Sequence, residues 1–119
     1  MKTTSPLPIA MACLAAGVLL APGSALAADE EAAVKTLRQN SCFRCHAVNR
    51  GKSGPAWQKI SQKYHSRPGA EERLTHYLTS EGQVALFPDG HEEPHKTLQG
   101  SARDDPETMK NLVQWILSR

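Results

Sequence analysis

Two cysteines and a histidine stand close together in the first half of the chain, in the order Cys42-Phe43-Arg44-Cys45-His46. Two thiols three positions apart, followed at once by an imidazole, have the spacing that attaches haem covalently. Each thiol adds to one vinyl group of the porphyrin, and the adjacent imidazole then lies under the ring, where it binds iron. The spacing therefore predicts one covalent haem c, held by Cys42 and Cys45, with His46 as an axial ligand of the iron.

Other uses of a close cysteine pair fit the sequence less well. A structural zinc site needs four ligands, and the only other cysteine, Cys13, lies in an apolar segment near the start of the chain. A thioredoxin-type redox pair needs a strand-helix-strand setting, and no alternating or β-branched run surrounds Cys42. A plain disulfide between Cys42 and Cys45 stays open as an alternative, although it gives His46 no role.

Residues 1–27 have the organisation of a secretory signal peptide. A short basic start, Met1-Lys2, precedes an apolar run over residues 9–20, and a tail of small residues ends in Ala25-Leu26-Ala27. The apolar run is short for a bilayer, and no cluster of positive charge follows it. We expect cleavage after residue 27 and export to the periplasm, with an uncleaved anchor as the alternative. The remainder, residues 28–119, is then one small domain.

Apolar periodicity and helix-end signals predict that this domain is all-α. A first helix begins at the acidic residues 29–31 and ends before Ser41, so that it delivers Cys42 to its place. Further helices are expected from residue 56 or 57 to residue 64 and over about 70–80. Proline and glycine recur between residues 83 and 102, which predicts a loop there.

The last helix has the clearest signals. Asp105 is placed to cap it, and Pro106 suits its first position. Its apolar residues follow the i, i+3, i+4, i+7 spacing of a buried helix face, and they are Met109, Leu112, Val113 and Ile116.

Charge is unevenly distributed along the chain. Between residues 32 and 70 there is no acidic residue, but there are the basic residues Lys35, Arg38, Arg44, Arg50, Lys52, Lys59, Lys63 and Arg67. Acidic residues predominate from residue 71 to residue 107. Such a dipole is able to orient an encounter with a redox partner, although uneven sampling of an ordinary solvated surface explains it equally well. Binding to nucleic acid is not expected.

Residues 28–119 resemble the small monohaem class I cytochromes c of bacteria over essentially their whole length. Besides the cysteine–histidine motif, the resemblance rests on Gly54-Pro55-Ala56-Trp57, where Pro55 follows His46 by nine residues, and on the closing Leu112-Val113-Gln114-Trp115-Ile116-Leu117. It implies three to five helices wrapped around one haem, whose edge is exposed in a cleft. It also implies an electron carrier or electron-transfer subunit rather than an enzyme.

The resemblance assigns roles to residues beyond the attachment motif. The carbonyl of Pro55 is expected to accept a hydrogen bond from the second ring nitrogen of His46, which fixes the tautomer and orientation of the proximal ligand. Trp57 and Trp115 are expected to pack near the porphyrin, although both also suit a plain core.

The second axial ligand is where the sequence departs from the family. These cytochromes usually supply a methionine from the loop before the last helix, but residues 83–102 contain none, and Met109 belongs to the apolar helix face. His95 follows Pro94 at the place of the family's ligand-bearing segment, so we expect His95 to bind the iron from the distal side. His91 is the second choice. Lys96, which must first lose its proton, and an empty sixth position are the remaining ones.

This ligand set predicts a low-spin haem that carries single electrons. An imidazole in place of a thioether lowers the reduction potential, within a range of about 0.8 V spanned by axial ligation and setting. The expected partners are oxidoreductases, met transiently or as subunits of one complex, and no membrane span remains after signal cleavage. The alternative function is a small-molecule binder or peroxidase-like haem protein, which needs an open or displaceable sixth position.

Overall fold

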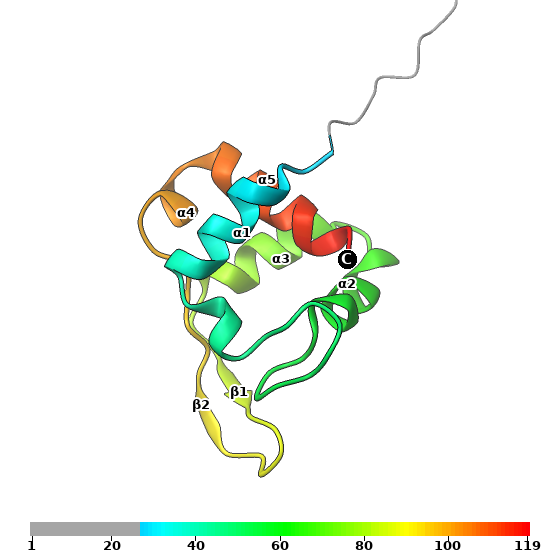
Figure 1. Ribbon diagram of the computed structural model, residues 1–119, viewed down its shortest axis with the longest axis vertical. Coiled ribbons are helices and arrows are strands. Elements are labelled where there is room, and N and C mark those ends of the chain that lie inside the picture. Colours follow the sequence, from blue (N-terminus) through cyan, green and yellow to red (C-terminus); the bar gives the residue numbers. More distant parts are fainter. Residues whose placement is uncertain (1–26) are drawn as a thin grey trace, which may run out of the picture.

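Helices α1 (Glu30–Gln39) and α5 (Pro106–Leu117), at the two ends of the described chain, pack against each other (Figure 1). The computed structural model describes residues 27–119, so the expected signal peptide lies, apart from its last residue, outside the described part. Between α1 and α5 come η1 (Cys42–Arg44), α2 (Trp57–His65), α3 (Ala70–Thr79), β1 (Gln83–Ala85), β2 (Glu92–Pro94) and α4 (Ser101–Asp104).

Both terminal helices begin at aspartate caps. The carboxylate of Asp29 accepts a hydrogen bond from the backbone N–H of Ala32 at 3.0 Å, and that of Asp105 accepts one from the N–H of Thr108 at 2.9 Å. These bonds satisfy donors that have no partner within the first turn of a helix. Pro106, which has no N–H, occupies the first position of α5 as the sequence predicts.

The core lies where α2, α3 and α4 meet the two crossing helices. The apolar face predicted for α5 is buried, and α1 contributes Ala33 and Leu37 from the side that faces it. Most of the remaining core comes from the other helices and from the segment before α4, as Trp57, Leu74, Leu78, Leu98 and Ala102. Burial of this apolar area is the main source of stability in the helical body.

The prediction that residues 83–102 form a loop was wrong in part. Strands β1 and β2 pair antiparallel in a hairpin, with Gln83 opposite Pro94, and α4 follows as one short turn of helix. The hairpin extends away from the helices, and its turn is closed by a hydrogen bond from the N–H of Leu86 to the carbonyl of His91 at 2.8 Å. Its strands are mostly exposed and lack an alternating apolar pattern, so the turn-forming residues were the dominant signal in the sequence.

The described part of the chain is therefore mainly helical, with a small sheet of two strands. Within residues 27–119, none of the helices combines the length and the apolar character that crossing a membrane requires.

Candidate haem site

The two cysteines lie on a tight turn that directly follows α1. Ser41 has a φ of 59°, which reverses the chain after the helix, and the 3-10 helix η1 begins at Cys42. Side chains three residues apart eclipse each other in this type of helix, so Cys42 and Cys45 project to the same side. Both are free thiols and half-buried. This arrangement suits attachment of one flat group at two points.

His46 is oriented by the backbone nine residues later. Its Nδ1 lies 2.7 Å from the carbonyl oxygen of Pro55. A carbonyl only accepts hydrogen bonds, so Nδ1 carries the proton and Nε2 keeps a lone pair. The ring therefore has one nitrogen free to bind a metal ion, and a carbonyl acceptor that fixes its tautomer.

Gly54 allows this close approach, a role that the sequence did not predict. A Cβ atom at residue 54 would lie 2.8 Å from Cε1 of His46 and 3.1 Å from the carbonyl oxygen of Cys45. The N–H of Gly54 also donates to that carbonyl at 2.8 Å, which holds the loop against the attachment turn. Only glycine fits between the loop and the imidazole without a shift of one of them.

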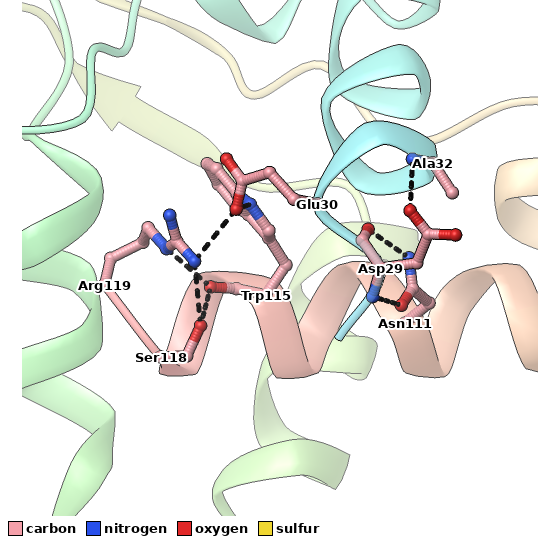
Figure 2. A network of polar contacts seen from close by, with 7 residues as sticks. All are labelled: Asp29, Glu30, Ala32, Asn111, Trp115, Ser118 and Arg119. Carbon is pink, nitrogen blue, oxygen red and sulfur yellow. Dashed lines mark hydrogen bonds and ion pairs between the residues drawn. The ribbon is translucent and has the colours of Figure 1, made fainter. Parts of the chain in front are cut away.

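The two tryptophans lie at different distances from the imidazole. The Trp57 ring is 4.6 Å from that of His46, centroid to centroid, and Trp57 is only 3% exposed. Trp115 packs 6.0 Å from Trp57, and its indole N–H donates to the carboxylate of Glu30 at 2.6 Å (Figure 2). The polar edge of Trp115 thus belongs to the contact between α1 and α5, and Trp57 stands between Trp115 and His46.

The segment after the hairpin brings a second imidazole to the first. The rings of His95 and His46 have centroids 6.3 Å apart and planes at 63° to each other. His95 is half-buried beside Tyr77, whose ring centroid lies 4.9 Å from its own. His91, by contrast, lies in the exposed turn of the hairpin.

Burial affects the ionisation of both histidines in the same direction. Desolvation lowers the pKa of His46 below its ordinary value of 6.5; the charge of Lys52 lowers it further, and the Pro55 hydrogen bond opposes the shift. Desolvation also lowers the pKa of His95, with a smaller contribution from His46. Both imidazoles are therefore neutral at pH 7 and have a lone pair to donate.

Basic side chains surround the attachment turn. Lys52 donates a hydrogen bond from its ammonium to the carbonyl of Phe43, and Arg44 is exposed on η1 itself. Burial raises the pKa of the Cys42 thiol, and the nearby ammonium of Lys96 opposes that shift. The loop after α1 and the segment after the hairpin thus both place positive charge at the edge of the site.

The donor set fits a haem and does not fit a metal ion bound by protein alone. Residues 27–119 contain no group of three or more histidine, cysteine or acidic side chains arranged to hold a metal ion. They do present two thiols on one turn and two neutral imidazoles whose ring centroids lie 6.3 Å apart. Two buried side-chain nitrogens among these residues, Nε1 of Trp57 and Nδ1 of His95, also have no hydrogen-bond partner. Haem requires only axial ligands and thiols from the chain.

Helices α1 and α5 crossing above a Cys-x-x-Cys-His turn define the class of this protein as a class I cytochrome c. The family model described as cytochrome c matches residues 31–119, and the chain belongs to the cytochrome c family. Its haem c is attached through Cys42 and Cys45, and members of the family carry electrons rather than catalyse a reaction.

Named relatives agree with this assignment. Cytochrome c-551 of Pseudomonas aeruginosa is 30% identical over 109 residues, which cover 92% of this chain and 93% of the relative. The class 1 cytochrome MtoD of Sideroxydans lithotrophicus ES-1 is 44% identical with a TM-score of 0.69, over 77% of this chain and 97% of that one. The N64Del mutant of Nitrosomonas europaea cytochrome c552, at 24% identity and a TM-score of 0.55 over 71% and 96% of the two chains, shares the fold.

Proposed function

We propose that this cytochrome is a periplasmic electron carrier whose haem iron is bound by two histidines, His46 and His95. The spacing of the two rings, with centroids 6.3 Å apart, is the observation that carries this proposal. A metal ion that binds one nitrogen of each ring at about 2 Å, the usual metal–imidazole distance, requires centroids roughly 6 Å apart. An angle of 63° between the ring planes is compatible, since a metal on the line where the planes meet lies in both.

The residues of the chain have separate tasks in this function. When bound, the haem supplies a one-electron couple between ferric and ferrous iron. Cys42 and Cys45 fix its position, and the Pro55 carbonyl orients His46 and makes its imidazole a better electron donor. Two neutral imidazoles held by a packed helical body keep the same ligand set in both oxidation states. Little rearranges when an electron arrives or leaves, which suits a carrier.

Replacement of His95 by methionine tests the distal ligand. A thioether favours ferrous iron more than an imidazole does, so His95→Met should raise the midpoint potential, within the range of about 0.8 V that axial ligation and setting span. His91→Met is the matched control, because it places the same thioether in the exposed turn, and it should leave the midpoint unchanged. An unchanged midpoint potential and absorption spectrum in His95→Met would show that His95 does not bind the iron.

Binding of small molecules separates the carrier from the alternative function. Nδ1 of His95 has no hydrogen-bond partner in residues 27–119, and this favours a weaker distal bond than the one made by His46. A carrier should give low-spin electron paramagnetic resonance and absorption spectra and should take up carbon monoxide slowly. Rapid uptake by the reduced resting protein would instead support a small-molecule binder or a peroxidase-like protein with a displaceable sixth ligand.

The sequence of residues 1–27 supports the periplasmic part of the proposal. The signal-like order of residues 1–27 is the supporting feature, because secretory signals are removed after small residues such as Ala27. Mass spectrometry of the protein from a periplasmic fraction should show a chain that begins at Ala28 and carries one haem. A haem-bearing chain that retains residue 1 in the membrane fraction would contradict this part.

The charge around the attachment turn favours redox partners with an acidic contact surface. Arg44, Lys52 and Lys96 lie beside the thiols that hold the porphyrin edge. Encounter between opposite charges is faster and depends on salt. The reduced protein should therefore react faster with an anionic oxidant such as ferricyanide than with a cationic cobalt complex of similar potential, and salt should reduce the difference. Equal rates at low salt would rule out such steering.

A further inference from the structure

The segment that bears His95 is held in place by three backbone N–H groups. The N–H of His95 donates to the carbonyl of Gly82 at 2.7 Å, and that of Leu98 donates to Leu78 at 2.9 Å. These two bonds connect the segment to the hairpin base and to α3. The third is different in kind, because the N–H of Gln99 donates to a side chain, the Oδ1 of Asn40, at 3.0 Å.

Asn40 lies on the other side of the site, in the segment that leads to the attachment cysteines. It is the C-cap residue of α1 and stands two positions before Cys42. Its Nδ2 donates to the carbonyl of Thr36 within α1 at 3.0 Å. The N–H of Gln99 only donates and the carbonyl of Thr36 only accepts, so the two bonds together fix the orientation of the amide.

The burial of the polar side chain of Asn40 needs a physical explanation. Asn40 is 7% exposed and lies among core residues, where an amide left without partners costs about 1–3 kcal/mol. Capping of α1 uses only the Nδ2 of the amide. The Oδ1 accepts a hydrogen bond from a residue 59 positions later in the sequence. It therefore links the segment that carries the attachment thiols to the segment that carries His95.

We propose that Asn40 is a positioning residue for the distal ligand. It holds the segment of His95 at a set distance from the attachment turn, and thereby keeps the imidazole of His95 within reach of an iron whose place is set by Cys42 and Cys45. This inference rests on the proposed function, in which His95 is a ligand. Without the bond to Gln99, the segment keeps its hairpin and α3 hydrogen bonds but loses the hydrogen bond that ties it to the end of α1.

The rate at which cyanide binds to the ferric protein measures this role, because cyanide enters only after the distal ligand has left. Asn40→Leu removes both hydrogen bonds at similar volume and should increase the rate by about tenfold, as loss of about one hydrogen bond to the ligand-bearing segment implies. Asn40→Ala carries the same prediction if leucine prevents folding. Asn40→Asp keeps the acceptor for Gln99 and should bind cyanide at nearly the original rate, although a carboxylate at a helix C-terminus destabilises the fold.

Asn111→Leu is the matched control for a merely structural effect. Asn111 also bridges to the start of α1, through two hydrogen bonds with the backbone of Asp29 at 2.6 and 3.0 Å (Figure 2). It lies on α5, however, in the contact between α1 and α5 rather than beside the segment of His95. This variant should lose thermal stability and keep the original cyanide rate. If it accelerates cyanide binding as much as Asn40→Leu does, Asn40 acts only through general stability and the inference is overturned.

The His95→Ala background separates this inference from the proposed function. If His95 is the ligand, His95→Ala binds cyanide fastest, and addition of Asn40→Leu changes nothing further. An effect of Asn40→Leu that persists in this background would show that Asn40 acts by another route, which refutes the positioning role alone. A His95→Ala variant that binds cyanide at the original rate would refute the proposed ligand itself.

Discussion

The contact between α1 and α5 and the pair of imidazoles are built on opposite principles. In the helix contact, polar groups find partners within the chain: Asn111 bonds to the backbone of Asp29, and Trp115 and Arg119 both reach Glu30 (Figure 2). At the imidazoles, Nδ1 of His95 and Nε1 of Trp57 are buried without a partner in residues 27–119. The helix contact thus satisfies its polar groups without a cofactor, whereas the haem site leaves two buried nitrogens unpaired within residues 27–119.

Removal of the attachment thiols is the strongest way to test this contrast. Cys42→Ala with Cys45→Ala should abolish covalent haem and lower the free energy of unfolding by more than about 4 kcal/mol, the stabilisation that a ligand gives at a thousand times its dissociation constant. A domain of this size buries only about 60–65% of its unfolded surface on its own, so its core is thin. Haem staining after denaturation and thermal unfolding by circular dichroism measure the two effects.

Cys42→Ala alone leaves one thioether bond to the haem. Its free energy of unfolding should lie between those of the original protein and the double variant. A double variant as stable as the haem protein would show that the helical body needs no cofactor, and the contrast between the two regions would fail.

A methyl group at residue 54 disturbs the site without touching the helix contact. Gly54→Ala places a Cβ against the His46 ring and the Cys45 carbonyl, so the loop or the ring must move. Such overpacking typically costs about 1–3 kcal/mol, and here it should also change the absorption spectrum of the haem. Gly82→Ala is the control, since a Cβ there meets nothing within 4 Å. Equal stability and equal absorption spectra of the two variants would contradict the close approach of residue 54 to His46.

Loss of Glu30 tests the other region. Glu30→Ala leaves the indole N–H of Trp115, which is buried, without its acceptor and removes the partner of Arg119 at 3.1 Å. We expect a stability loss of about 1 kcal/mol, because water can reach part of this contact, and no change in spectrum or midpoint potential. Glu31→Ala removes a neighbouring charge from the same helical turn and should have a smaller effect. A spectral change in Glu30→Ala would show that the two regions are coupled.

The smallest expected effect is a dependence of the α5 cap on pH. Hydrogen bonds from the Thr108 side chain and backbone lower the pKa of Asp105 below its ordinary value of 3.8. A group whose pKa is lower in the folded state stabilises the fold above its unfolded pKa, and this contribution disappears as the pH falls through the folded value. Asp105→Ala should therefore lower the melting temperature at pH 7 and converge with the original protein in acid. Asp104→Ala, which removes the neighbouring charge, should not show this convergence.

Local signals in the sequence predicted helices α1, α2, α3 and α5. Asp105 caps α5 as its position suggested, because a cap depends on residues two or three positions away, and α1 begins at the acidic residues expected at its start. The bond of His46 to Pro55 spans nine residues, and only the family resemblance indicated it. The hairpin escaped prediction because its strands are exposed, and the role of Gly54 escaped because a close approach has no signature in composition.

The sequence by itself determined that this chain carries covalent haem, since two thiols and an imidazole at fixed spacing are a local chemical requirement. It also determined that the domain is helical, because periodic apolar residues need one face to bury. Only the tertiary structure decided which parts of the chain meet across the site. His95 contacts His46 although the two are separated by 49 positions in the sequence, and Asn40 bonds to Gln99 across 59 positions. Such meetings depend on how packed helices place their loops, and no local pattern of residues encodes that placement.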